Sequence, residues 1–200
     1  FYFPNRKTYL IYYFNMSLTK TPICEFGKKA SNFELKSTEN KIVSLDNIKG
    51  ENGTLIMFIC NHCPYVKVVI DDIIQDCKKL ETMGVKFAAI SSNDVKNYPE
   101  DSFENMIKFA KKNNFNFPYL FDENQQVAKT YNAVCTPDFF GYNKNLELQY
   151  RGRIREVREL KNVKNSDSDL YKAMTQIVKT NKGPENQIPS MGCSIKWINN

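Results

Sequence analysis

The sequence predicts a three-layer α/β sandwich with a mixed central sheet, an N-terminal hairpin extension and a C-terminal tail. Three observations predict this fold. Buried strands and amphipathic helices alternate in the first half of the chain, an order that requires parallel strands joined by crossover helices. A pair of short strands precedes this alternation. A second pair follows it before the last helix, and such hairpins add antiparallel strands to the sheet.

The first elements are a hairpin, a buried strand and a helix. Residues 33–45 are expected to form two short strands around a polar turn at 38–41. Residues 54–60 (TLIMFIC) are a continuous apolar run, which is typical of a strand buried on both faces of a sheet. Apolar residues then recur every three or four positions over 66–80, the pattern of an amphipathic helix. We expect this helix to end near Gly84, because glycine suits helix C-termini.

The same patterns predict the remaining elements. Residues 85–90 (VKFAAI) form a second buried strand, and the apolar spacing over 103–110 predicts another helix. The elements expected after it are a strand at 119–121, a helix at 124–131, a hairpin of strands at 138–142 and 146–151 around a turn at 143–145, and a helix over 170–177 that begins in the polar residues 166–169.

Length and hydropathy describe one domain without a transmembrane helix. The chain has 200 residues and a mean hydropathy of −0.51. No apolar run approaches the roughly 20 residues that a transmembrane helix needs. Residues 1–15 (FYFPNRKTYLIYYFN) lack an initiator Met and a signal-peptide cleavage site. We interpret them as a non-native or disordered leader, place a single domain at 16–200 and expect a cytoplasmic protein.

The basic charge does not indicate a nucleic-acid-binding protein. The net charge is +6, and lysine pairs at 28–29, 78–79 and 111–112 are spread along the chain. Nucleic-acid-binding proteins instead concentrate basic residues on one face. The densest basic stretch, RGRIREVR at 151–158, is expected to be a solvated strand end. We therefore expect neither nucleic acid nor a membrane as a partner.

The chemistry is predicted at Cys60-Asn61-His62-Cys63. Cys60 ends a buried strand and Cys63 begins a helix, so that their sulfurs can meet across one helical turn. Unpaired N–H groups and the dipole at a helix N-terminus favour a thiolate. His62, the one histidine of the chain, can add positive charge beside Cys60. We expect both effects to lower the pKa of Cys60 and make it a nucleophile near neutral pH.

Two cysteines at this spacing are also half of a zinc site. A structural zinc site needs a second pair of ligands at similar spacing, but the cysteines at 24, 77, 135 and 193 are isolated in the sequence. Six cysteines with one close pair are also too few for a disulfide scaffold. We therefore favour redox chemistry and expect no metal and no other cofactor.

Three segments resemble a known family. They are residues 58–67 (FICNHCPYVK), 134–140 (VCTPDFF) and 189–197 (PSMGCSIKW). In this order they resemble the active-site segment, the cis-proline loop and the C-terminal signature of a redoxin branch of the thioredoxin-like superfamily. That branch is related to the alkyl-hydroperoxide-reductase/thiol-specific-antioxidant (AhpC/TSA) group. The resemblance extends from about Pro22 onward and implies a thioredoxin-like fold.

The resemblance also implies roles for four residues. Cys60 would be the attacking cysteine and Cys63 the resolving one. Pro137 would be a cis-proline whose loop faces the two cysteines. Thr136 would offer backbone hydrogen bonds to an extended substrate segment.

The chain departs from two better-known groups. Thioredoxins carry a buried acidic residue in the strand before the motif, whereas residues 54–59 contain none, which leaves the proton acceptor for Cys63 unassigned. Peroxiredoxins place a threonine three residues before their cysteine, where it positions peroxide. Met57 stands there relative to Cys60, although Pro64 after Cys63 matches the Cys-Pro of that group.

Two further cysteines have open roles. Cys135 is either a third redox thiol or a semi-buried bystander. Cys193 can form a second disulfide or reach the site from the tail, unless the tail merely packs through Ile195 and Trp197.

Polar residues near the motif are weaker candidates. Lys67, one turn after Cys63, can assist thiolate formation, although an exposed helix lysine is the usual case. Arg153 can line the site. Asn93 and Asp94 follow a buried strand, where α/β proteins place functional loops, but we expect them to form a turn.

The predicted reaction is thiol–disulfide exchange on protein or low-molecular-weight thiols and disulfides, with an unidentified electron donor. The alternatives are a thiol-dependent peroxidase and a redox-sensing module without turnover. Because His62 would stabilise the reduced thiolate, we expect a potential less reducing than that of thioredoxins. A His62→Pro variant should then be more reducing.

Overall fold

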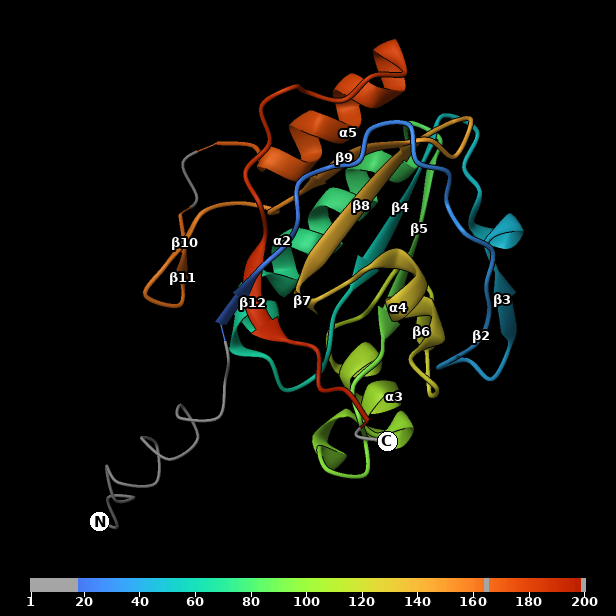
Figure 1. Ribbon diagram of the computed structural model, residues 1–200, viewed down its shortest axis with the longest axis vertical. Helices are drawn as coiled ribbons and strands as arrows, with labels where there is room; N and C mark the ends of the chain where they lie inside the picture. The colour runs from blue at the N-terminus through green and yellow to red at the C-terminus, as the bar shows by residue number, and fades with distance from the viewer. Residues whose placement is uncertain (1–17, 164–165, 199–200) are drawn as a thin grey trace.

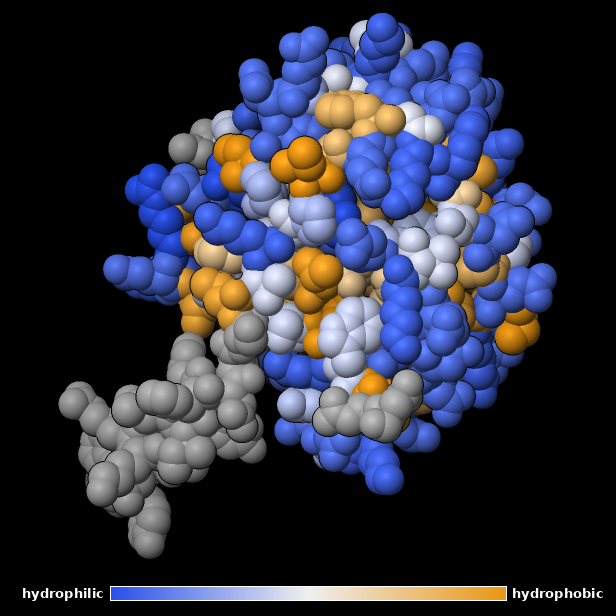
Figure 2. All heavy atoms as spheres, in the orientation of Figure 1, coloured by the Kyte–Doolittle hydropathy of each residue, from blue (hydrophilic) through white to orange (hydrophobic). Residues whose placement is uncertain are grey.

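The computed structural model describes residues 18–163 and 166–198. The leader that we expected at 1–15, and the domain boundary after it, lie outside the described residues. None of the described helices is long and apolar enough to cross a membrane, and the cytoplasmic location stays a prediction. On the face shown in Figure 2, hydrophilic residues cover most of the surface and hydrophobic residues form separate groups.

A seven-stranded mixed sheet forms the centre of the molecule, as predicted (Figure 1). The central strand β5 pairs in parallel with β4 and β6, and β4 pairs antiparallel with β8 on its other side. In sheet order the strands are β3 (Ile42–Ser44), β2 (Glu34–Ser37), β6 (Tyr119–Phe121), β5 (Val85–Ser91), β4 (Gly53–Phe58), β8 (Asp138–Asn143) and β9 (Leu148–Gly152).

Helices cover both faces of this sheet, which gives the three layers. The helices α2 (Pro64–Glu81), α3 (Phe103–Lys112) and α5 (Asp169–Thr180) pack on one face. The helix α4 (Gln126–Tyr131) and the short 3-10 helix η1 (Asp46–Ile48) pack on the other. A second 3-10 helix, η2 (Pro99–Asp101), lies in the connection from β5 to α3.

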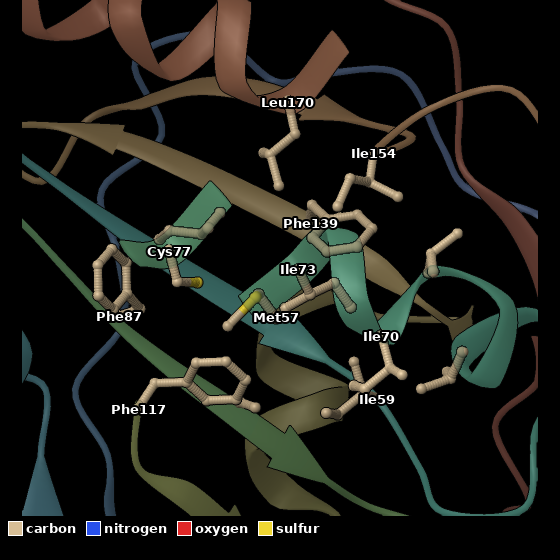
Figure 3. Close-up of a cluster of buried hydrophobic side chains, with 14 of the residues drawn as sticks. Met57, Ile59, Ile70, Ile73, Cys77, Phe87, Phe117, Phe139, Ile154 and Leu170 are labelled. Carbon is tan, nitrogen blue, oxygen red and sulfur yellow. The ribbon is translucent and has the colours of Figure 1, made fainter. Parts of the chain in front are cut away.

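The strand β4 is buried on both faces, which explains its continuous apolar run. Met57 joins the cluster on the α2 face and Phe58 joins the cluster on the α4 face, both with no exposed surface. Figure 3 shows Met57 among Ile73 and Cys77, which lie on the buried stripe of α2. The burial of several such apolar side chains, at about 25 cal/mol per Å² of apolar surface, is the main force that holds α2 against the sheet.

A small second sheet was not predicted. Its order is β1 (Leu18–Lys20), β12 (Met191–Ser194) and β7 (Cys135–Thr136), all antiparallel. Figure 1 shows β12, in red, next to β1, in blue, near the beginning of α2. The C-terminal tail is therefore an ordered strand at the cysteine motif. A separate hairpin is formed by β10 (Val157–Arg158) and β11 (Lys161–Asn162).

The expectation of a solvated strand end at 151–158 is wrong for two of its arginines. The Arg151 side chain is 1% exposed and donates to Asp138 over 2.9 Å. The Arg155 side chain is 10% exposed and lies 3.2 Å from a carboxylate oxygen of Asp72. Each guanidinium therefore has a buried carboxylate partner, whereas Arg158 is exposed as expected.

Two features at the ends of elements differ from the sequence pattern. The strand β4 ends at Phe58, so that Cys60 lies in the loop after it. Ile195 of the tail is buried as expected, but Trp197 is 37% exposed and does not anchor the tail in the core. Gly84 adopts a left-handed φ of 77° just after α2, in keeping with its expected place at the helix end.

Candidate active site

Three elements bring the two cysteines to one point. Cys60 lies in the loop after β4, and Cys63 is the N-cap residue of α2. Pro64 takes the first helical position, where a missing N–H costs no intrahelical hydrogen bond. The Thr136–Pro137 bond is cis and joins β7 to β8. Because the residue after Pro137 pairs with the last residue of β4, this loop lies beside the motif.

The sulfur atoms of Cys60 and Cys63 both contact Thr136. The Cys60 sulfur lies 3.3 Å from the Thr136 hydroxyl oxygen, and the Cys63 sulfur lies 3.2 Å from the Thr136 carbonyl oxygen. The Cys63 sulfur also lies 2.8 Å from the sulfur of Cys193 on β12. All three cysteines are free thiols and almost completely buried. The structure thus places Cys60, Cys63 and Cys193 in one buried cluster.

The surroundings lower the pKa of Cys63 rather than that of Cys60, and the expected lowering of the Cys60 pKa is wrong. Burial, a hydrogen bond with Cys63 and the negative charge of Asp101 raise the pKa of Cys60 well above its usual value. Burial also raises the pKa of Cys63, but hydrogen bonds from the Cys193 and Cys60 thiols outweigh it and leave that pKa well below its usual value. Cys63, not Cys60, is the N-cap residue, where the helix favours an anion.

A buried carboxylate organises the loop between the cysteines. Asp101, on η2, accepts hydrogen bonds from the backbone N–H groups of Asn61 (2.7 Å) and His62 (3.2 Å) through one oxygen. Its other oxygen lies 2.6 Å from Nδ1 of His62 and 2.7 Å from the side-chain nitrogen of Asn93. Sequence reasoning missed Asp101, because it lies 39 residues from His62 in a connection without periodic pattern.

Asp101 favours the charged form of His62. Burial lowers the pKa of His62, but the hydrogen bond and the charge of Asp101, together with the charge of Cys63, outweigh burial and raise it. The imidazole also stacks on Tyr98 at 5.9 Å with an interplanar angle of 10°. The charged form of His62 and an anion on Cys63, one residue along the chain, therefore favour each other.

The expected turn at residues 93 and 94 is confirmed for Asp94 alone. Asp94 accepts hydrogen bonds from the backbone N–H groups of Lys96 and Asn97. Asn93 instead links Asp101 to the C-terminal tail, because its side-chain oxygen accepts from the backbone N–H of Lys196 over 2.9 Å. The tail and the histidine are thus joined through Asp101.

The other predicted accessory residues lie around this centre. Cys135 is buried rather than semi-buried, its sulfur lies 4.0 Å from the Pro137 carbonyl oxygen, and burial raises its pKa. Lys67 is exposed on the first turn of α2 and lies with His62 at one surface hollow. Arg153 donates to Asp169 over 2.7 Å and, with Pro137, lines a cavity of about 280 Å³.

Among the described residues, one group offers three potential metal ligands. Atoms of Cys60, His62 and Asp101 lie within 4.8 Å of one another. Both Asp101 oxygens already accept two hydrogen bonds each, one of them from the ligating ring of His62. This arrangement supports an ion pair between Asp101 and His62.

Comparisons with known proteins support the fold and the resemblance. The crystal structure of an uncharacterized conserved protein from Geobacillus kaustophilus has a TM-score of 0.88 at 40% identity, covering 93% of this chain and 99% of that one. The thioredoxin domain of a thiol-disulfide oxidoreductase from Bacteroides vulgatus has a TM-score of 0.60 at 15% identity, covering 78% and 99%. The second likeness shows that the two chains share the thioredoxin-like fold.

A curated relative and a family model agree with these structures. The relative is the thiol-disulfide oxidoreductase ResA of Bacillus thuringiensis subsp. konkukian, 26% identical over 127 residues, which are 64% of this chain and 69% of the relative. The model of the AhpC/TSA family matches residues 26–157, which include the cysteine motif, the cis-proline loop and most of the central sheet. The chain belongs to the AhpC/TSA family.

Proposed function

We propose that this protein is a thiol–disulfide oxidoreductase whose redox pair is Cys60 and Cys63. One observation carries the proposal: two thiols and the backbone before a cis-proline meet where α2 begins, and the Cys63 pKa lies well below its usual value. A thiolate at this place can take the proton of the neighbouring thiol, and the thiolate formed in this way is the nucleophile of disulfide exchange. The name of the relative from Bacillus thuringiensis, a thiol-disulfide oxidoreductase, supports the same chemistry.

The charge distribution gives a route for the first step. Cys63 is the thiolate of the reduced protein and accepts a hydrogen bond from Cys60. As a disulfide substrate RS–SR′ approaches, the Cys60 proton moves to Cys63, and the Cys60 sulfur attacks. The Cys60–SR bond forms, the S–S bond of the substrate breaks, and R′S⁻ leaves. Cys63 thus accepts the proton of Cys60.

The second step releases the other half of the substrate. R′S⁻ takes the proton from Cys63, whose thiolate then attacks the sulfur of Cys60. The Cys60–Cys63 disulfide forms and RS⁻ leaves, so that the substrate has gained the two electrons that the protein has lost. The reverse sequence oxidises a dithiol. Protein and low-molecular-weight disulfides both satisfy this chemistry.

Substrate access requires the C-terminal strand to move. Cys60 and Cys63 are fully buried, and Thr136 already pairs with Cys193 of β12. We propose that Thr136 and Pro137 contact the substrate once β12 shifts, with the cavity beside Pro137 and Arg153 taking the rest of the substrate. Disulfide exchange at Cys60 and Cys63 therefore depends on the position of β12.

A redox titration in glutathione buffers tests this function. We expect a two-electron transition in which both cysteines of the tryptic peptide 50–67 lose reactivity toward an alkylating reagent and form a disulfide within that peptide, seen by mass spectrometry. A Cys60→Ser variant should lose this internal disulfide, and a Cys24→Ser variant should retain it. If the wild-type peptide instead gained oxygen from peroxide without a disulfide, the peroxidase alternative would replace the proposal.

Replacing His62 by Gln is expected to make the pair more reducing. The substitution removes the cation but leaves the buried anion of Asp101, so the reduced thiolate loses stabilisation. We expect the pKa of Cys63, the thiolate of the reduced protein, to rise by about one unit, or about 1.4 kcal/mol. This corresponds to a potential about 30 mV more negative. The pH dependence of alkylation and the glutathione titration measure the two quantities.

Gln isolates the effect of the ring better than Pro, because the His62 N–H donates to Asp101 and proline would remove it. An Asp101→Asn variant is the matched control. It removes the anion and, with it, the support for the cation, so its thiol pKa should shift less than in His62→Gln. An unchanged pKa in His62→Gln would contradict the assigned role of His62.

The raised pKa of His62 also has a consequence for stability. A histidine whose folded pKa is raised contributes stability that is fully present below its unfolded pKa, about 6.5, and is lost as pH rises through the folded pKa. The difference in unfolding free energy between the wild type and His62→Gln should therefore shrink as the pH rises from 6 to 9. Urea denaturation of the reduced proteins measures it.

A further inference from the structure

The strand β12 holds a third thiol against the redox pair. Cys193 lies opposite Thr136 in the antiparallel pairing of β12 with β7, and its side chain points to Cys63. The two sulfurs are 2.8 Å apart, and Cys193 is 2% exposed. Cys63 also exchanges a hydrogen bond with Cys60. Cys63 is thus in hydrogen-bond contact with two other sulfurs, that of Cys60 and that of Cys193.

Several contacts fix Cys193 in this place. β12 pairs with β1 on one side and β7 on the other. Gly192 packs so closely that a Cβ there would lie 2.0 Å from the Thr136 carbonyl oxygen. Before it, the Ser190 hydroxyl donates to the Pro137 carbonyl over 2.6 Å. After it, the backbone N–H of Lys196 donates to Asn93. Residues of the site therefore hold β12 on both sides of Cys193, and this fixes the position of the thiol.

We propose that Cys193 is a third redox-active cysteine, which exchanges with the Cys60–Cys63 disulfide to form a Cys63–Cys193 disulfide and release Cys60. The inference rests on the proposed redox role of the Cys60–Cys63 pair and extends it to the tail.

The exchange needs no further oxidant. The Cys193 thiolate attacks the sulfur of Cys63, the Cys63–Cys193 bond forms, and the Cys60–Cys63 bond breaks. Cys60 leaves as a thiolate and takes the proton that Cys193 lost, so that one disulfide and one thiol are present before and after. The number of electrons is unchanged, and only the partner of Cys63 differs.

The state of Cys63 controls when Cys193 reacts. In the reduced protein, the hydrogen bond that Cys193 gives to Cys63, together with burial, raises the pKa of Cys193 and keeps it a thiol. Oxidation of Cys63 removes the anion that holds this proton, and Cys193 becomes free to attack. The product ties β12 covalently to α2 and leaves Cys60 as a free thiol.

Disulfide mapping of the full chain tests the proposal. In Cys60→Ser, five of the six cysteines remain. On treatment with diamide we expect two of these five thiols to be lost, with tryptic peptides 50–67 and 183–196 joined by a disulfide. A second substitution, Cys193→Ser, should abolish the link. Cys135→Ser in the same background should leave it intact, although Cys135 lies on the neighbouring strand β7.

The wild type provides a second measurement that does not depend on the folding of a variant. Oxidised to one disulfide per chain and quenched by alkylation, it should give both the disulfide within 50–67 and the link between 50–67 and 183–196. Gly192→Ala should lower the share of the link severalfold and leave the internal disulfide, because the added Cβ forces β12 away from Thr136.

The two possible failures are distinct. A wild type that forms the internal disulfide but never the link, together with a Cys60→Ser protein that keeps all five thiols or joins 50–67 to another peptide, would overturn the role of Cys193 and leave the proposed function standing. A wild type that forms no disulfide within 50–67 would overturn the proposed function itself.

Discussion

Replacing Cys63 by Ser is expected to lower the turnover of disulfide reduction by a factor on the order of 10³ or more, because members of a catalytic unit act together. The variant loses both the base that takes the Cys60 proton and the thiolate that resolves the mixed disulfide. With oxidised glutathione, a mixed disulfide on Cys60 should form slowly and then persist. Reduction of insulin disulfides measures turnover, and the mass of peptide 50–67 reports the trapped adduct.

Two variants accompany this experiment. Cys60→Ser should show the same loss of turnover but no persistent adduct in peptide 50–67. Cys24→Ser, outside the sulfur cluster, should retain turnover. A persistent adduct in Cys60→Ser but not in Cys63→Ser would reverse the roles of the two cysteines and make Cys63 the attacking residue.

Replacing Arg151 by Met is expected to destabilise the protein by about 3–5 kcal/mol near pH 7.5, because it leaves a buried carboxylate without its partner. Arg151 donates to Asp138 and to the Asn132 carbonyl oxygen, and its guanidinium lies 4.5 Å from the ring centre of Phe140. Asp138 has no exposed surface, and burial raises its pKa to about 6 even beside Arg151. Urea denaturation measures the loss.

The pH dependence gives a second check on this pair. Without Arg151 the pKa of Asp138 should rise further, and the carboxyl group favours folding only while it is protonated. The penalty in Arg151→Met should therefore be small below about pH 6, where Asp138 is protonated in both proteins, grow as the pH rises to the folded pKa of Asp138 in the variant, and level off above it. A double variant, Arg151→Met with Asp138→Leu, should regain most of the loss. A loss below about 1 kcal/mol in the single variant at pH 7.5 would contradict this account.

The long elements of the fold were predictable because their patterns are local. A run of apolar residues such as 54–60 is typical of a strand buried on both faces, and β4 covers most of it. The spacing over 66–80 places its apolar side chains on one face of a helix, and α2 follows that stripe. The strands β7 and β12 were missed. They have two and four residues, too few for a pattern, and their pairing joins segments far apart in the chain.

The charges of the Arg151 stretch show a different limit. Arg151 and Arg155 have the sequence signature of a solvated strand end, because nothing local reveals a partner. Asp138 and Asp72, which make their burial tolerable, are supplied by β8 and α2. A charged side chain can be buried only beside such a partner, and only the tertiary structure decides which carboxylate lies next to each arginine.

The sequence by itself predicted that the chemistry lies at Cys60 and Cys63. A strand, a two-residue spacing and a helix are local features, and they place both thiols at a helix N-terminus. Only the tertiary structure decided which thiol carries the charge. Cys193 and Asp101 come from distant segments. Cys193 lies 2.8 Å from the Cys63 sulfur and lowers the pKa of Cys63, and Asp101 raises the pKa of Cys60 and supports the charged form of His62. Electrostatic interactions depend on distance in space, and the local sequence pattern does not predict how close Cys193 and Asp101 lie to the motif.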